Sequence, residues 1–115
     1  MKHDHLELCL LFDFYGEMLT DKQRELFDLY YNEDLSLSEI AEHAGITRQG
    51  VRDAVVRAEH TLTALEDKLH LVEKFVSIKE KIHRIRELTG HCEAMSKQEL
   101  VTEVEHISQE ILEEL

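Results

Sequence analysis

The stretch SLSEIAEHAGITRQGVRDAVV, residues 36–56, decides the fold of this chain. A helix-turn-helix needs a small residue where its two helices cross, and Ala41 occupies that place. It also needs a residue that accepts a left-handed backbone at the sharp turn, and Gly45 follows four residues later. The spacing predicts a helix-turn-helix over residues 36–57, and the alternative is an ordinary helical hairpin with an incidental glycine. Five apolar packing positions complete the pattern: Ile40, Ala44, Ile46, Val51 and Ala54.

Composition and helix-start signals extend this prediction to an all-α protein. The chain has no proline and only four glycines among 115 residues, so long helices are possible. Capping boxes, in which a Ser or Thr precedes a Gln or Glu by three residues, begin at Thr20, Ser36 and Ser96. Thr47 is placed to cap a further helix. We expect helices over about 8–19, 21–31, 36–44, from 48 past 60, and from 96 onward.

Beyond residue 60 an apolar stripe continues at spacings of three and four residues. One step of three replaces a step of four near Leu71, which indicates either a stammer in one helix or a break between two. The stripe is too long for residues 1–60 to cover, so it needs the final helix or a second copy, and we favour a homodimer. We therefore expect a bundle over 1–60 and long amphipathic helices for dimerisation over 61–115, within one structural unit. The stripe consists of Leu62, Leu65, Leu69, Val72, Phe75, Ile78, Ile82 and Ile85.

The second helix of a helix-turn-helix presents its N-terminal residues to the major groove of DNA. Arg48 and Arg52 lie one turn apart on one face, where both can reach a guanine edge or phosphates. Gln49 suits adenine, whereas Asp53 would repel phosphate or accept from cytosine. The alternative is a solvated helix face, in which Asp53 pairs with Arg57. The candidate DNA-binding residues are Thr47, Arg48, Gln49, Arg52 and Arg57.

The charge of the chain opposes this use. The formal net charge is -12, and residues 90–115 hold seven acidic side chains against one lysine. A field of this sign slows approach to nucleic acid, and a module with so few basic residues should bind DNA weakly and lose affinity with salt. A dimer would double the contacts and place two reading helices on half-sites about one DNA turn apart. The acidic tail is either a solvated face or a segment that docks on a basic surface or masks the reading helix.

Other chemistry finds little support in the sequence. The histidine-containing segments at His3, Asp4 and His5 and at His91 and Cys92 lack the four-ligand spacing of a zinc site. No nucleophile elbow, phosphate-binding loop or dinucleotide fingerprint occurs. No apolar run is long enough to span a membrane, and the N-terminus does not resemble a signal peptide. We therefore expect a cytoplasmic protein that is not an enzyme, needs no metal or cofactor and does not insert into membranes.

Two resemblances follow from these residues. The run LTDKQRELFDLYYNEDLSLSEIAEHAGITRQGVRDAVVRAE, residues 19–59, resembles region four of bacterial sigma factors, which reads an upstream promoter element. A more specific match, over about residues 8–75, is to the small YlxM-like helix-turn-helix proteins. The pieces FYGEMLTDKQ and SLSEIAEHAGITRQGV carry most of it. The fold implied is a helix-turn-helix bundle of the sigma factor region four type, extended by long C-terminal amphipathic helices.

The YlxM-like resemblance also implies a role. Genes of this family commonly neighbour those of the signal recognition particle GTPases, which implies a regulatory part in co-translational protein targeting. The chain departs from the family at Gly50, Arg52 and Ala54, where we expect alanine, tyrosine and asparagine. The leading hypothesis is a DNA-binding regulator, and the alternative is a protein that docks on the targeting GTPases without binding DNA. Binding to the particle RNA ranks last, because a helix-turn-helix suits A-form grooves poorly.

Overall fold

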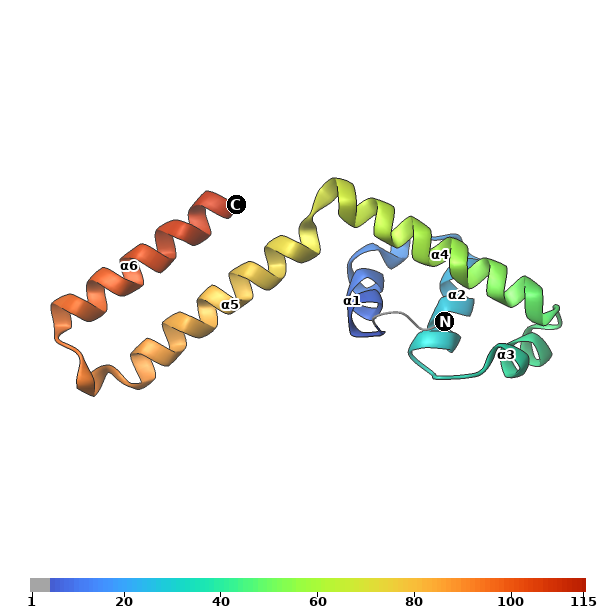
Figure 1. Ribbon diagram of the computed structural model, residues 1–115, viewed down its shortest axis with the longest axis horizontal. Helices are drawn as coiled ribbons and strands as arrows, with labels where there is room; N and C mark the ends of the chain where they lie inside the picture. Colours follow the sequence, from blue (N-terminus) through green and yellow to red (C-terminus); the bar gives the residue numbers. More distant parts are fainter. Residues whose placement is uncertain (1–4) are drawn as a thin grey trace. The chain divides into compact units, whose positions relative to one another are not determined.

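The computed structural model describes residues 5–115, and every regular element in this part of the chain is a helix (Figure 1). The all-α prediction is therefore confirmed. Two short 3-10 helices, η1 (Gly16–Met18) and η2 (Cys92–Ala94), join the longer ones. The α-helices are α1 (His5–Tyr15), α2 (Asp21–Tyr31), α3 (Leu37–Ala44), α4 (Arg48–Leu69), α5 (Leu71–Gly90) and α6 (Lys97–Glu114).

The helix boundaries follow the local signals closely. All three predicted capping boxes form, at Thr20, Ser36 and Ser96. Gly45 has a φ of 70°, the left-handed conformation expected at the end of α3. The first helix differs from the prediction: α1 ends at Tyr15, and the chain continues through η1 instead of running as one helix to residue 19.

The chain divides into two compact units, one ending at Val72 and one covering Glu73–Leu115. In the first unit α4 packs against α1, α2 and α3, and its buried side chains lie at helical spacing. Aromatic rings fill the space between α1 and α2, where the ring of Phe27 stacks on that of Phe12 at 4.8 Å. The core consists of Leu8, Leu11, Tyr15, Leu19, Leu26, Phe27, Tyr30, Tyr31, Ile40, Val51, Val55, Ala58, Leu62 and Val72.

Two tyrosine–carboxylate hydrogen bonds connect α4 to the helices that it covers. The Tyr31 hydroxyl donates to Glu59 Oε1 at 2.5 Å, and the Tyr15 hydroxyl donates to Glu66 Oε1 at 2.6 Å. Burial, reinforced by the neighbouring carboxylate, raises the pKa of both phenols, so each stays protonated and able to donate. Glu59 is a buried acid, and burying it without a donor would be costly.

The junction between α4 and α5 is a break at His70, which has a φ of 55°. The sequence had left open a stammer or a break, and the structure has the break. Glu66 accepts the backbone N–H of Val72 at 3.0 Å, while the Tyr15 hydroxyl accepts that of Leu71 at 3.2 Å. These contacts satisfy donors that the first turn of α5 would otherwise leave unpaired.

In the second unit α5 and α6 run antiparallel, side by side (Figure 1). Lys81 Nζ lies 3.0 Å from Glu114 Oε2, and Ser77 donates to the same carboxylate at 2.6 Å. The Ser77 hydrogen bond, together with Lys81, lowers the pKa of Glu114. Ile107 of α6 is fully buried, and no helix within residues 5–115 is long and apolar enough to cross a membrane.

The apolar stripe expected to form one interface is divided between the two units. Leu62 and Val72 are buried in the first unit and Leu65 packs against that core, so these three side chains are already covered within the chain. This corrects their assignment to a dimer surface. The first unit therefore extends past the boundary expected near residue 60, because Leu62 and Val72 complete its core. The rest of the stripe is exposed at Leu69, Phe75 and Ile82 and half-buried at Ile78 and Ile85.

The turn glycine gives a direct test of this fold. Gly45→Ala should lower the free energy of unfolding by about 1–2 kcal/mol, because an L side chain is strained at this φ. A Cβ at Gly45 would meet no atom within 4 Å, so the loss would be conformational and not steric. Gly90→Ala is the matched control, since that position is equally open and has no positive φ. Urea unfolding followed by circular dichroism measures the free energy of unfolding of both variants. Equal stability would contradict the assignment of a left-handed turn at Gly45.

Candidate nucleic-acid interface

The turn between α3 and α4 is built by backbone contacts that its sequence dictates. Gly45 and Ile46 both donate their N–H groups to the Ala41 carbonyl, at 3.0 and 3.2 Å, which closes the end of α3. Thr47 then caps α4 by accepting the Gly50 N–H at 2.9 Å. Ile40 and Val51 are fully buried and hold the two helices together. The N-terminal turns of α4 are therefore fixed relative to α3.

The other motif positions differ in how far they are covered. Ala41, Ile46 and Ala54 are half-buried against the core, as side chains near a helix crossing should be. Ala44 is a correction, because it is exposed instead of packed. It is the last residue of α3, directly before the left-handed Gly45.

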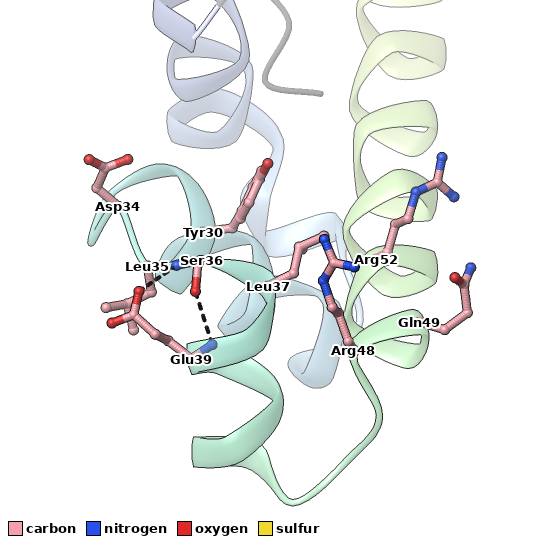
Figure 2. Close-up of a pocket in the computed structure, with 9 residues that line it drawn as sticks. All are labelled: Tyr30, Asp34, Leu35, Ser36, Leu37, Glu39, Arg48, Gln49 and Arg52. Carbon is pink, nitrogen blue, oxygen red and sulfur yellow. Dashed lines mark hydrogen bonds between the residues drawn. The ribbon is translucent and has the colours of Figure 1, made fainter.

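The predicted DNA-reading residues are all on the surface, at the N-cap and in the first three turns of α4. Thr47, Arg48, Gln49, Arg52 and Arg57 are all exposed. Arg48, Gln49 and Arg52 line an open groove of about 770 Å³ between α4 and the segment that leads into α3 (Figure 2). The remaining lining residues, which the sequence had not singled out, are Tyr30, Asp34, Leu35, Ser36, Leu37 and Glu39.

The two walls of this groove carry opposite charge. Figure 2 shows the guanidinium groups of Arg48 and Arg52 on the α4 side and the carboxylates of Asp34 and Glu39 on the other. Glu39 Oε1 accepts the Ser36 backbone N–H at 3.0 Å, and this hydrogen bond lowers the pKa of Glu39. That carboxylate is committed to the α3 capping box. It remains ionised and points at its own helix end, not at the arginines.

No carboxylate within residues 5–115 lies within ion-pair distance of Arg48, Arg52 or Arg57. A guanidinium stays charged under all ordinary conditions. The exposed surface of α4 thus carries three cations whose charge is not neutralised by a neighbour in the described part of the chain. Such groups are available for phosphate oxygens or for guanine.

Asp53 has a different partner from the one considered in the sequence. Its Oδ1 accepts a hydrogen bond from Gln49 Nε2 at 2.9 Å, one helical turn away. Arg57, the competing partner, makes no ion pair with it. Both pairs have the same i, i+4 spacing, so spacing alone was unable to choose between them.

Gly50 lies beside the hydroxyl that caps α4. Glycine inside a helix costs up to about 1 kcal/mol relative to alanine. A Cβ at Gly50 would lie 3.1 Å from Thr47 Oγ1, closer than an ordinary contact. An alanine at this position would require the capping hydroxyl of Thr47 to shift by a few tenths of an ångström. The signal was the Thr47–Gly50 spacing, because the cap acceptor and the capped N–H are three residues apart.

The part of the chain that the structure describes contains no candidate metal site. No group of three or more His, Cys, Asp or Glu side chains is arranged to hold an ion there. His5 and His91 are exposed, while His3, Asp4 and the Cys92 side chain lie outside the described residues.

Comparison with known proteins gives the family. Residues 2–107 match the family model UPF0122, described as "Putative helix-turn-helix protein, YlxM / p13 like". The chain belongs to this YlxM/p13-like family. Its description names a helix-turn-helix and no enzymatic activity.

Curated relatives agree with this membership. This YlxM/p13-like chain is 44% identical over 115 residues to a UPF0122 protein of Thermoanaerobacter sp. strain X514, covering 100% of this chain and 96% of the relative. It is 53% identical over 87 residues to UPF0122 protein TTE1463 of Caldanaerobacter subterraneus subsp. tengcongensis, covering 76% and 74%. A UPF0122 protein of Desulforamulus reducens is 42% identical over 113 residues, covering 98% and 96%. The matches include both helices of the helix-turn-helix and extend beyond them.

Proposed function

We propose that this chain is a non-catalytic, DNA-binding regulatory protein that reads the major groove with the first turns of α4. The observation that carries the proposal is the exposed pair Arg48 and Arg52, which has no acidic partner among the described residues. Val51 and Val55 of the same helix are buried in the core, so the arginines are held on a rigid support. Exposed cations on the second helix of a helix-turn-helix suit contact with DNA.

The affinity of one copy for DNA should be modest. Three arginines supply few phosphate contacts, and the formal net charge of -12 repels the DNA backbone at low ionic strength. Each phosphate contact contributes about 0.9 to the slope of log affinity against log salt on duplex DNA. Binding that rests on Arg48 and Arg52 therefore has a shallow salt dependence with a predictable change on mutation.

The double variant Arg48→Ala, Arg52→Ala tests this proposal. It should lower affinity for a selected duplex at least tenfold and reduce the salt slope by about 1 to 2, because up to two phosphate contacts are lost. Fluorescence anisotropy over a salt series measures both quantities. The double variant Lys79→Ala, Arg86→Ala removes the same charge from exposed positions of α5 and serves as the control. Equal losses in the two variants would mean that net charge, and not the α4 surface, governs binding.

We also propose that two copies associate through the second unit. Phe75 and Ile82 are 42% and 47% exposed on α5, and with Ile78 and Ile85 they keep alternating steps of three and four. Val101 and Leu112 of α6 are exposed as well. Ile107 is the one buried apolar side chain described within this unit, which is a thin core for two long helices. A second copy with the same spacing is the partner that suits such a stripe.

Ile82→Glu should convert a dimer into a monomer, since a charge would be buried in the centre of the stripe. Sedimentation velocity at several concentrations reports the mass, and circular dichroism verifies that the helices persist. Glu80→Gln, at an exposed α5 position, should leave the dimer unchanged. A wild-type chain that sediments as a monomer at high micromolar concentration would remove the dimer proposal.

A second candidate function is docking on the targeting GTPases of the signal recognition particle, as the YlxM-like resemblance implies. The feature that favours it is the exposed acidic surface of α6, at Glu99, Glu103, Glu105 and Glu113. Several acidic side chains on one helix can form complementary contacts with a basic protein surface.

This candidate predicts that the purified chain changes GTP hydrolysis by those GTPases. Glu103→Gln with Glu105→Gln should weaken the effect at low salt, because the attraction is electrostatic. Arg48→Ala with Arg52→Ala should leave it intact. Absence of any rate change at micromolar chain concentration would eliminate the candidate, whatever the outcome with DNA.

A further inference from the structure

The side chains of Gln49 and Asp53 form a pair on the outer face of α4, among the residues that would meet base edges. Gln49 Nε2 lies 2.9 Å from Asp53 Oδ1, and both side chains are exposed. An ionised carboxylate only accepts hydrogen bonds, so the Gln49 amide must turn its NH₂ group, and not its oxygen, toward Asp53. Asp53 therefore determines the orientation of the Gln49 amide, with its NH₂ group toward the carboxylate and its carbonyl oxygen away from it.

The orientation of the amide determines what it can offer to a base. The NH₂ group has two N–H donors, of which Asp53 takes one. Gln49 is left with one N–H and with a carbonyl oxygen that has no hydrogen bond in the described part of the chain. One donor beside one acceptor matches the major-groove edge of adenine, where N7 accepts and the N6 amino group donates.

Guanine is disfavoured by the same arrangement. Its major-groove edge presents two acceptors, N7 and O6, and needs two donors from the protein. With one N–H held by Asp53, Gln49 can supply only one, and its carbonyl oxygen would face O6. Release of the amide from Asp53 would allow it to rotate and to direct both N–H groups at guanine.

We infer that Asp53 is a positioning residue which sets the base preference of Gln49 to adenine over guanine. This inference rests on the proposed DNA-binding function and adds a specificity determinant to it. A carboxylate at a DNA-facing position repels phosphate, so it lowers total affinity while it raises selectivity. The hydrogen bond is weak in open water and strengthens when DNA excludes water from around it.

The test begins with selection of a preferred duplex by the wild-type chain from double-stranded DNA with a randomised centre. Affinities are then measured for this duplex and for single-base-pair variants, using wild type, Gln49→Ala, Asp53→Ala and the double variant. We expect one adenine to be preferred over guanine by about tenfold in wild type. Each single variant should lose that preference, and Asp53→Ala should cause no further change in base preference in the Gln49→Ala background.

Two further readouts separate positioning from a merely structural role. Asp53→Glu keeps a carboxylate within reach of Gln49 at the same i, i+4 spacing and should retain most of the preference. Asp53→Ala should raise affinity for unrelated duplex DNA, since it removes a negative charge. Thermal unfolding of each variant should match wild type, because both side chains are exposed.

The outcomes distinguish this inference from the proposed function. An unchanged adenine preference in Asp53→Ala would overturn it while leaving DNA binding in place. A change at a different base pair, additive with Gln49→Ala, would also overturn it, because Asp53 would then read a base itself. A wild-type chain that shows no preference among duplexes would remove both proposals together.

Discussion

The fold of the first unit depends on a single buried face of α4. Val51, Val55, Ala58 and Leu62 are spaced by four, three and four residues, and all are fully buried. Helices α1, α2 and α3 each pack on this helix. The orientation of the outer face follows from this burial, because rotation of α4 about its axis would expose the whole set. Arg48 and Arg52 therefore owe their exposure to the same residues that build the core.

Two hydrogen bonds join α4 to the helices that it covers, and hydrogen bonds are directional whereas apolar packing is not. Tyr31 and Tyr15 donate to Glu59 and Glu66, which lie two helical turns apart along α4. A buried carboxylate without a donor is costly, so each hydrogen bond favours one register of α4 against α2 and α1. Glu66 also receives the Val72 N–H, so the start of α5 is tied to the first unit by the group that holds Tyr15. The left-handed His70 lies between the two helices at this connection, and Val72 is buried beside it.

Helix caps and the turn glycine could be predicted from the sequence. The choice between two hydrogen-bond partners at the same spacing could not. The capping boxes and the left-handed Gly45 depend on a few adjacent residues, and they form as expected. The stripe from Leu62 to Ile85 slips by one residue near Leu71, but the slip alone did not distinguish a stammer in one helix from a break between two units. Asp53 had two possible partners one helical turn away, Gln49 and Arg57. Only the folded structure shows that Gln49 makes the hydrogen bond. The close approach of Gly50 to the Thr47 hydroxyl also became visible only in the structure.

The acidic side chains oppose the proposed contact with DNA less than the formal net charge of the chain suggests. Glu110 and Glu114 lie within ion-pair distance of Lys81 or Arg84, so part of the C-terminal acidity joins α5 to α6. At physiological ionic strength screening acts over about 8 Å, and the charges next to a contact matter more than the sum over the chain. Around the first turns of α4 those charges are Arg48, Arg52 and the carboxylate of Asp53, with Asp34 and Glu39 on the other wall of the groove. The Asp53 carboxylate holds the Gln49 amide, and under the proposed function it would lower affinity for phosphate while it raises discrimination between bases. An acidic chain with a short basic strip is therefore suited to weak, selective contact that association of two copies would strengthen.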